Sequence, residues 1–195
     1  MKHKVFILLV VLFFSCNNEN ERKIAVFNNY FEALKEESDQ KWLYTTDTVK
    51  LWFDKKEGEP ILIVKNDTST GKWAGWDKVM KSKSYYDSIW FEKSEQVIRG
   101  YFFEENDFYK LINKKPTKTL RSYWLNDNNK IEEILIYWIP GVNTTTAQHL
   151  KPIIAWAEKY DSLRLSRIYQ NGIIPSAENA REWKELINEY NEMKK

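Results

Sequence analysis

The chain has 195 residues and carries 30 Lys and Arg against 28 Asp and Glu, with 9 Trp, 11 Tyr and 10 Phe but one Cys and two His. So few Cys and His residues exclude a zinc finger, a His-rich metal site and a disulfide framework, because each needs several such side chains converging on one point. The length fits one domain, and so many aromatic residues are untypical of a disordered chain.

The N-terminal segment has the features of a lipoprotein signal peptide. Lys2, His3 and Lys4 precede ten apolar residues at 5–14. This run is typical of a signal peptide and too short for a membrane-spanning helix, which needs about 20 residues. The sequence Leu-Phe-Phe-Ser-Cys at 12–16 resembles a bacterial lipoprotein signal, in which a small residue precedes the lipid-bearing cysteine. We expect removal of residues 1–15 and lipidation of Cys16; the alternative is an ordinary signal peptide or anchor with an incidental cysteine.

Processing at this position changes the charge and the chemistry of the chain. Loss of Lys2 and Lys4 lowers the basic count from 30 to 28, equal to the 28 acidic residues. The mature chain is then neutral and lacks the positive excess typical of nucleic-acid binding. Lipidation of Cys16 removes the only thiol, and a Ser/His/Asp arrangement would have to use His149, which we expect to be a surface or capping residue. Residues 16–23 are polar and predict a flexible tether.

The elements after the tether are predicted from periodicity. Apolar residues at three- and four-residue spacing predict a helix from Ile24 to Leu34, and Ser38 can begin a second, short helix. Residues 49–53 and 61–64 read as a hairpin, and a third short helix contains Trp76. Four further strands are expected around residues 85–91, 96–103, 119–125 and 131–139, and their short connections imply antiparallel pairing.

Two details of the strands can be predicted. A turn centred on residues 126–129 would place Leu120 opposite Leu135 and Trp124 opposite Ile131. Gly100 lies inside an aromatic strand and indicates a bend or bulge. The remainder of the chain, 141–195, is predicted as helices, the last one capped by Ser176, which pack on the sheet or its rim.

The order of these elements resembles the nuclear transport factor 2-like superfamily, which includes SnoaL-like proteins and ketosteroid isomerase. The resemblance covers residues 24–139 and is carried by the segments 30–34, 41–44, 76–79, 121–124 and 131–138. It implies an α+β fold, in which a curved antiparallel sheet wraps around the N-terminal helices as a cone with an apolar pocket at its open end. We therefore divide the chain into a signal peptide (1–15), a tether (16–23), a cone-like domain (24–140) and a helical extension (141–195).

Five residues are candidates for this pocket. Asp87 is a mid-strand carboxylate, and Arg99 and Arg121 lie in otherwise apolar strands, where a guanidinium could hold an anionic ligand or the carboxylate itself. Tyr123 and Trp138 could line the same space. The alternatives are solvent-facing residues or a structural ion pair for the charged three, and core packing for the two aromatic residues.

A second candidate site is a glycan platform. Trp73 and Trp76, flanked by glycines, could stack on sugar rings, although large aromatic side chains are the usual material of a core. The leading hypothesis is a non-catalytic envelope lipoprotein, lipid-anchored to a membrane that is expected to be the outer membrane, which binds a small apolar or aromatic ligand or a protein partner. The alternatives are a cofactor-independent lyase or isomerase using Asp87 with Tyr123 or Arg121, and glycan binding. No metal, cofactor or nucleic acid is expected.

Overall fold

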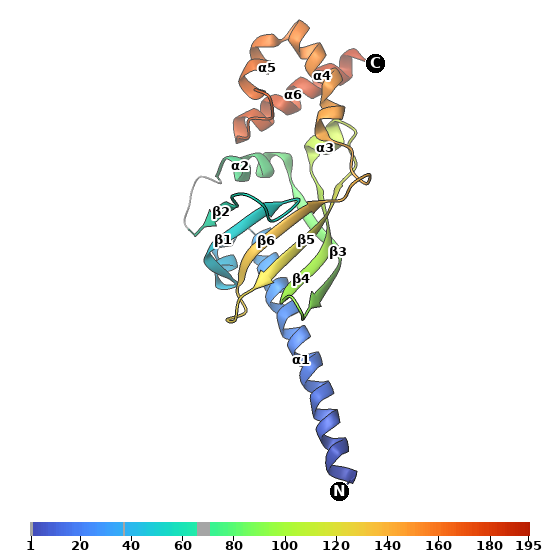
Figure 1. Ribbon diagram of the computed structural model, residues 1–195. Helices are drawn as coiled ribbons and strands as arrows, with labels where there is room; N and C mark the ends of the chain where they lie inside the picture. Colours follow the sequence, from blue (N-terminus) through green and yellow to red (C-terminus); the bar gives the residue numbers. More distant parts are fainter. Residues whose placement is uncertain (1, 37, 66–70) are drawn as a thin grey trace. The chain divides into compact units, whose positions relative to one another are not determined.

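The computed structural model describes residues 2–36, 38–65 and 71–195 and has α+β architecture (Figure 1). Its elements follow the predicted order, with one additional short helix after the fourth strand. They are α1 (Lys2–Lys35), η1 (Asp39–Leu43), β1 (Thr45–Phe53), β2 (Ile61–Val64), α2 (Gly71–Met80), β3 (Lys83–Glu92), β4 (Val97–Glu105), α3 (Asp107–Leu111), β5 (Thr117–Leu125), β6 (Ile131–Trp138), α4 (Thr146–Tyr160), α5 (Ser162–Ile168) and α6 (Ala177–Met193).

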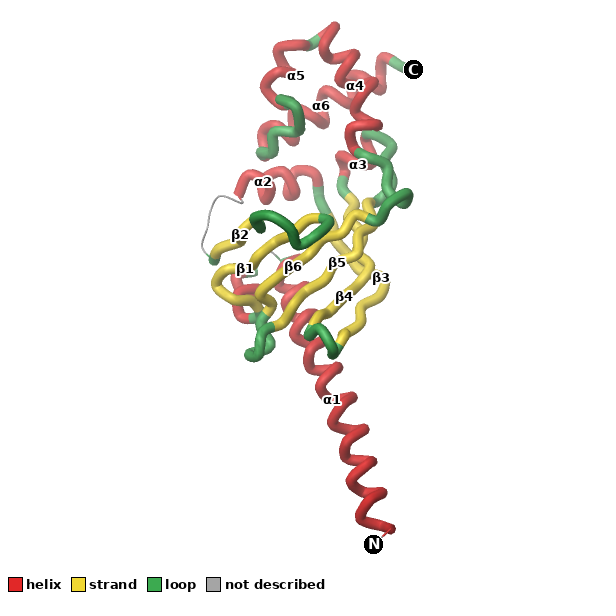
Figure 2. The backbone as a smooth tube through the Cα atoms, viewed as in Figure 1, coloured by secondary structure: helices red, strands yellow, loops and turns green. Residues whose placement is uncertain are grey.

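The six strands form one sheet in the order β2-β1-β6-β5-β4-β3 (Figure 2). β1 pairs antiparallel with β2 but parallel with β6. The α+β fold class is confirmed, and the sheet is mixed where a purely antiparallel one was expected. The parallel pair joins strands that are distant in sequence, which connection lengths between neighbouring strands cannot reveal.

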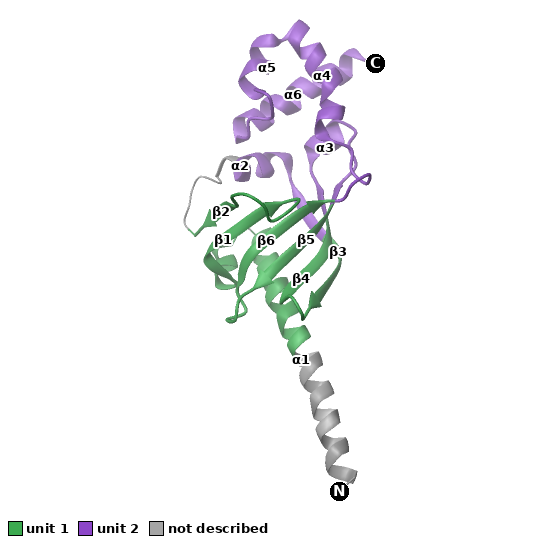
Figure 3. Ribbon diagram, in the orientation of Figure 1, with its two compact units in different colours: residues 1–65, 86–102, 119–138 green, residues 66–85, 103–118, 139–195 purple. Residues whose placement is uncertain are grey.

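The chain divides into two compact units (Figure 3). Unit 1 comprises residues 1–65, 86–102 and 119–138, and unit 2 comprises residues 66–85, 103–118 and 139–195. This division differs from the predicted boundary at residue 140. The reason lies in the core of unit 2, where α2 and α3 bury their apolar side chains together with those of the C-terminal helices.

The core of unit 1 lies between α1 and the sheet. Phe27 and Phe31 of α1 contact three aromatic rings from the strands. The ring centroid of Phe27 is 4.9 Å from that of Tyr123 and 5.8 Å from that of Phe102, and Phe31 is 5.2 Å from Tyr86. Such edge-to-face packing adds to the free energy gained by burial. Aromatic side chains therefore fill the space between the helix and the sheet in this unit.

α1 contacts the rest of unit 1 already before Ile24. Residues 16–23, predicted as a flexible tether, are helical, and Lys23 is only 8% exposed. Its Nζ donates to Gln96 Oε1 (3.0 Å), and Glu19 pairs with Lys93 (2.7 Å). Positions 19, 23 and 27 share one helix face, so these polar residues extend the stripe that faces the sheet. Cleavage before Cys16 stays a prediction. Among the described residues, no helix is long and apolar enough to cross a membrane.

The β5–β6 hairpin is paired two residues away from the predicted register. Leu120 lies opposite Tyr137 and Trp124 opposite Glu133, with a shift in register before Leu125. The turn is longer than expected, because Asn126 N donates to Lys130 O and Asn126 Oδ1 accepts from Lys130 N. A shift of two residues keeps every side chain on its predicted face.

Gly100 is required by the close approach of β3. A Cβ atom at this position would lie 2.7 Å from both Ser88 O and Ile89 Cγ2, closer than real contacts allow. Tyr86 and Ile89 both pack against the unit 1 core although strict alternation would separate them. A break in alternation is thus present in β3 at its close contact with Gly100, whereas the prediction placed a bend or bulge in the strand of Gly100 itself.

The core of unit 2 is built from five helices. Trp183 of α6 is fully buried, and its Nε1 donates to Ile168 O (3.3 Å). Lys184 of α6 donates to Val79 O (2.8 Å) and pairs with Asp107 (2.9 Å), which ties α6 to α2 and α3. Ser176 is the predicted N-cap of α6, and its Oγ accepts from Asn179 N (2.9 Å). The predicted C-terminal helices are present, but their core is shared with α2 and α3, whereas packing on the sheet or its rim was expected.

Candidate functional site

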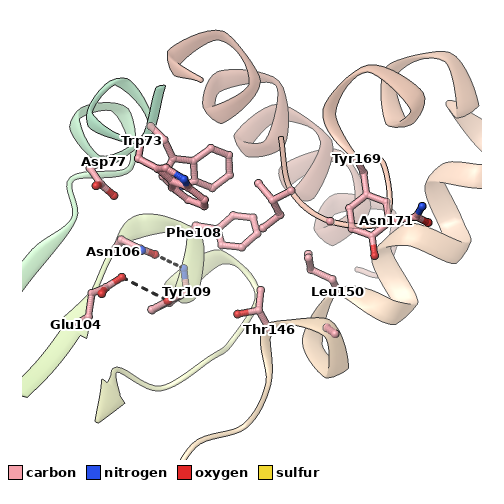
Figure 4. A pocket seen from close by; sticks show the side chains of 14 residues that line it. Trp73, Asp77, Glu104, Asn106, Phe108, Tyr109, Thr146, Leu150, Tyr169 and Asn171 are labelled. Carbon is pink, nitrogen blue, oxygen red and sulfur yellow. Dashed lines mark hydrogen bonds between the residues drawn. The ribbon is translucent and has the colours of Figure 1, made fainter. Parts of the chain in front are cut away.

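A cavity of about 620 Å³ lies within unit 2 (Figure 4). Its walls come from α2, from the end of β4 with α3, from the start of α4 and from the segment after α5. The residues that line it are Trp73, Trp76, Asp77, Glu104, Asn106, Phe108, Tyr109, Thr146, Ala147, Leu150, Tyr169, Asn171, Gly172 and Ile173. These segments are distant from one another in the sequence, and the shared core of the five helices brings them together.

Three rings form an angled wall on one side of the cavity. Trp73 and Trp76 meet at 70° with centroids 6.3 Å apart, and Trp76 and Phe108 meet at 70° with centroids 5.3 Å apart. Trp76 is 3% exposed and belongs to the core, whereas Trp73 is 53% exposed. Because successive rings are nearly perpendicular, the wall offers both ring faces and ring edges to a ligand.

The polar side of the cavity contains Tyr109 and two carboxylates. The Tyr109 hydroxyl lies 3.5 Å from Glu104 Oε1, and Asp77 Oδ1 accepts a hydrogen bond from Ser82 Oγ (2.7 Å). Burial raises the pKa of Tyr109 to about 12, and the charges of Glu104 and Asp77 act in the same direction. Tyr109 is therefore a neutral phenol at physiological pH. Asn106 caps α3, and its Oδ1 accepts from Tyr109 N (2.8 Å).

A buried lysine lies next to Tyr109. Lys114 is 7% exposed, its Nζ lies 3.7 Å from the ring centroid of Tyr109, and it donates to Thr117 Oγ1. Burial lowers the pKa of Lys114, while the nearby charge of Glu104 opposes that shift. Lys114 does not line the cavity, and its contacts fix the ring of Tyr109 in place.

The structure does not bring the five predicted pocket residues together. Arg99 pairs with Glu92 and with Glu95 (2.6 Å to the latter), which is the structural ion pair considered as its alternative. Asp87 is exposed and follows Tyr86, whose ring faces the unit 1 core, so its side chain points to the opposite face of β3. Asp87 and Arg99 therefore do not form an inward-facing site.

The other three predicted pocket residues differ in how far their side chains are buried. Tyr123 is 2% exposed and packs among the rings of the unit 1 core. Arg121 lies on the same face, with its Cζ 5.0 Å from the ring centroid of Phe102 and its Nε donating to Thr119 Oγ1 (3.2 Å). Trp138, at the end of β6, is 42% exposed. The acid–base set of Asp87 with Tyr123 or Arg121 is not formed, because Asp87 points away from the other two.

The predicted tryptophan pair does line the cavity, but not as two exposed rings: Trp73 is accessible, and Trp76 is buried because it faces the core of unit 2. No local pattern groups Glu104, Asn106 and Tyr109 with this pair. One usable signal was Asn106, since an Asn before an acidic residue is typical of a helix start and would have predicted α3.

Both ring nitrogens of His149 lie within hydrogen-bond distance of neighbouring groups. Its Nδ1 lies 3.0 Å from Ile112 O, and its Nε2 lies 2.8 Å from Thr144 Oγ1. A carbonyl oxygen can only accept, so Nδ1 carries the proton and Nε2 can accept from the threonine hydroxyl. Within the described residues, no group of three or more His, Cys, Asp and Glu side chains could hold a metal ion.

The order of the elements and the packing of α1 against the sheet agree with the expectation from the sequence resemblance. No protein-family model matches the sequence, and no curated protein matches it.

Several solved structures are similar in fold. A computationally designed 17-OHP binder is 12% identical, with a TM-score of 0.47 over 63% of this chain and 97% of its own. A protein of unknown function with a cystatin-like fold from Methylobium petroleophilum is 10% identical, with a TM-score of 0.47 over 66% and 89% of the two chains. A steroid delta-isomerase from Pseudomonas aeruginosa is 8% identical, with a TM-score of 0.44 over 72% and 92%.

Proposed function

We propose that the mature protein is a lipid-anchored protein of the bacterial cell envelope that binds a small, largely apolar or aromatic molecule in the unit 2 cavity, without chemical conversion. The observation that carries the proposal is the cavity of about 620 Å³ with aromatic walls. Small-molecule sites in proteins have volumes of roughly 300 to 1,000 Å³ and combine apolar walls with a few polar groups. The side chains of Asp77, Glu104 and Tyr109 supply such polar groups here.

A neutral apolar probe tests this binding role. N-phenyl-1-naphthylamine is titrated into a soluble form of the chain that starts at residue 17. The enhancement of its fluorescence reports entry into an apolar site. Trp73→Ala removes an exposed ring from the cavity wall, and we expect it to weaken binding by about 10-fold, as for other aromatic contacts worth 1–2 kcal/mol. Trp138→Ala is the matched control, because Trp138 is similarly exposed but does not line the cavity. Absence of binding, or equal loss in both variants, contradicts the proposal.

The anchor is tested separately in cells. The wild-type chain and Cys16→Ala are expressed in a bacterium that is fed an alkyne-bearing fatty acid. We expect the wild type to carry the label and to sediment with membranes, whereas Cys16→Ala should carry none. An unlabelled wild-type chain would contradict lipidation and leave the binding role to be judged by the probe alone.

A second candidate function, glycan recognition, is favoured by the exposure of Trp73. Its ring is 53% exposed beside Asp77 on the same helix, and such a ring can stack on the apolar face of a sugar. Soluble cell-wall fragments should then compete with N-phenyl-1-naphthylamine for the wild-type cavity. Competition that Trp73→Ala abolishes favours glycans over small apolar molecules as the natural ligand.

A further inference from the structure

We infer that two copies of this chain associate through β2, which pairs antiparallel with β2 of the second copy. This inference goes beyond the proposed function and does not depend on it. Three features of unit 1 carry it: the position of β2 at the edge of the sheet, its exposed apolar side chains and the charged residues on either side of it.

β2 forms one edge of the six-stranded sheet (Figure 2). Among the described strands it has one neighbour, β1, with which it pairs antiparallel. Lys65 N donates to Asp47 O (2.8 Å), and every second residue of an antiparallel strand bonds to the same neighbour. Leu62 and Val64 therefore direct their N–H and C=O groups away from β1, to the edge, where a further strand can bond to them.

The side chains of β2 are exposed although all four are apolar. Ile61 is 57% exposed, Leu62 53% and Val64 40%. No charged residue interrupts the strand, whereas natural edge strands commonly carry a charge, a proline or a bulge that prevents association. A second strand added at this edge gains backbone hydrogen bonds and covers apolar side chains at the same time.

The charged residues that flank β2 select both the partner and the register. Antiparallel pairing of two copies about a two-fold axis at Leu62 places Ile61 opposite the partner's Ile63. The same register places Glu59 opposite the partner's Lys65, so opposite charges meet at each end of the paired strands. A register centred on Ile63 allows as many backbone hydrogen bonds but sets Lys65 opposite the partner's Ile61. Charge complementarity therefore favours the register centred on Leu62.

Both charged residues are accessible for this pairing. Glu59 is exposed. Lys65 Nζ lies 3.8 Å from Asp47 Oδ1, and the two side chains are 44% and 86% exposed. An ion pair this long and this exposed contributes little to stability, so little is lost when Lys65 turns to a second carboxylate. The two-fold pairing uses the β2 edge of both copies and closes as a dimer. Four paired residues bury less area than a standard interface, and we expect a weak dimer with a Kd above about 1 µM.

An exchange of charges tests the pairing. Sedimentation equilibrium of the soluble chain that starts at residue 17 measures dimer formation from about 1 µM to about 1 mM. Glu59→Lys and Lys65→Glu, each alone, should weaken the dimer about 10-fold, because like charges then face each other at both ends. An equimolar mixture of the two variants should restore the wild-type affinity, since each end again joins opposite charges.

Two controls separate this effect from that of net charge. A chain with both Glu59→Lys and Lys65→Glu has the net charge of the wild type and should dimerise like it. Asp127→Lys changes the charge as Glu59→Lys does, but in the turn between β5 and β6, and should leave the dimer affinity unchanged. A chain that stays monomeric at about 1 mM overturns the inference, and so does a mixture that dimerises no better than either variant alone. The proposed function stands in both cases, because the apolar probe tests it separately.

A cysteine at the two-fold axis tests the register. The two Cα atoms at position 62 would lie about 5.5 Å apart, within the range that a disulfide bridges. The chain that starts at residue 17 has no cysteine of its own, so oxidation of Leu62→Cys should link the two copies. Ile61→Cys is the control and should link them far less, because the two copies of this position are offset by two residues. Equal linkage of both variants, or none at Leu62→Cys, overturns the register.

Discussion

Glu19 and Lys93 form an ion pair of 2.7 Å that joins α1 to the turn between β3 and β4. One helical turn later, the buried Lys23 donates to Gln96 of the same turn. The contacts between α1 and this turn thus reach to within three residues of Cys16, the predicted site of lipidation. Because three residues span at most about 10 Å, a lipid on Cys16 would hold this turn close to the membrane surface.

The first prediction concerns where the stable domain begins. Soluble chains starting at residue 17, 20 and 24 are compared by urea unfolding. We expect the chain starting at 20 to be as stable as that starting at 17, because an exposed ion pair contributes little. Loss of Lys23 should cost a further 1–2 kcal/mol or so, since its buried stem and its hydrogen bond are lost.

The outcome distinguishes a tether from an integral part of the fold. If the chain starting at residue 24 is as stable as the longest one, residues 16–23 act as the flexible tether suggested by their polarity. Lys23→Ala in the longest chain serves as the matched variant, because it removes the contact with Gln96 without shortening the helix.

The second prediction concerns Gly100. Gly100→Ala should destabilise unit 1 by about 1–3 kcal/mol, because its methyl group would lie 2.7 Å from Ser88 O and force β3 and β4 apart. Gly172→Ala is the control, since nothing lies within 4 Å of a Cβ atom there. Thermal unfolding of both variants checks the prediction, and equal melting temperatures would contradict the close approach.

The third prediction concerns the aromatic core of unit 1. Phe102 is fully buried and contacts the rings of Phe27, Phe31 and Tyr123. Phe102→Ala should therefore cost about 3–5 kcal/mol in the free energy of unfolding. Trp90→Ala, which removes a larger but 38% exposed ring, should cost clearly less. A small effect at Phe102 would mean that the space between α1 and the sheet is not tightly filled.

The fourth prediction concerns pH and the link between α3 and α6. The hydrogen bond from Lys184 holds the pKa of Asp107 below its ordinary value of 3.8. A carboxyl group with a lowered pKa in the folded state stabilises the protein above its unfolded pKa, and this contribution is lost as the pH falls through the folded pKa. Asp107→Asn should therefore be less stable than the wild type at pH 7, by up to about 1 kcal/mol.

The stability difference between the two proteins should shrink below about pH 4, where the wild-type carboxyl group takes up a proton. Urea unfolding at pH 7, 5 and 3 measures it. A difference that stays constant across this range would show that the effect of the substitution is steric and not electrostatic. Glu189→Gln is the matched control. Glu189 lies on α6, like Lys184, and is an exposed partner of Arg164 of α5.

Local patterns predicted the elements of this fold well. The spacing of Phe27 and Phe31 located the helix face that meets the sheet, and Ser38 and Ser176 were correctly expected as N-caps. The β5–β6 register was wrong because Asn126 bonds with Lys130 and lengthens the turn. The parallel pairing of β1 with β6 depends on contacts between distant segments, which no local pattern contains.

The candidate site was predictable only in part, for the same reason. Trp73 and Trp76 were identified because their spacing and their neighbouring glycines are visible in one short segment. Glu104, near the end of β4, and Tyr109 of α3 are distant from α2 in the sequence, and only the fold places them beside it. Asp87, Arg99 and Arg121 were chosen as charged residues in apolar strands, but alternation along a strand leaves open which face is inward when an irregularity such as that at Gly100 intervenes.

The walls of the cavity are contributed by four stretches of sequence, at residues 73–77, 104–109, 146–150 and 169–173. The last of them follows α5, so the cavity cannot exist until residues 169–173 have been made and, if the chain is exported, have crossed the membrane. A chain that stops before α4 would retain the residues of the unit 1 core and lack two of the four walls. Ligand occupancy would therefore report that synthesis and folding have proceeded through residues 169–173.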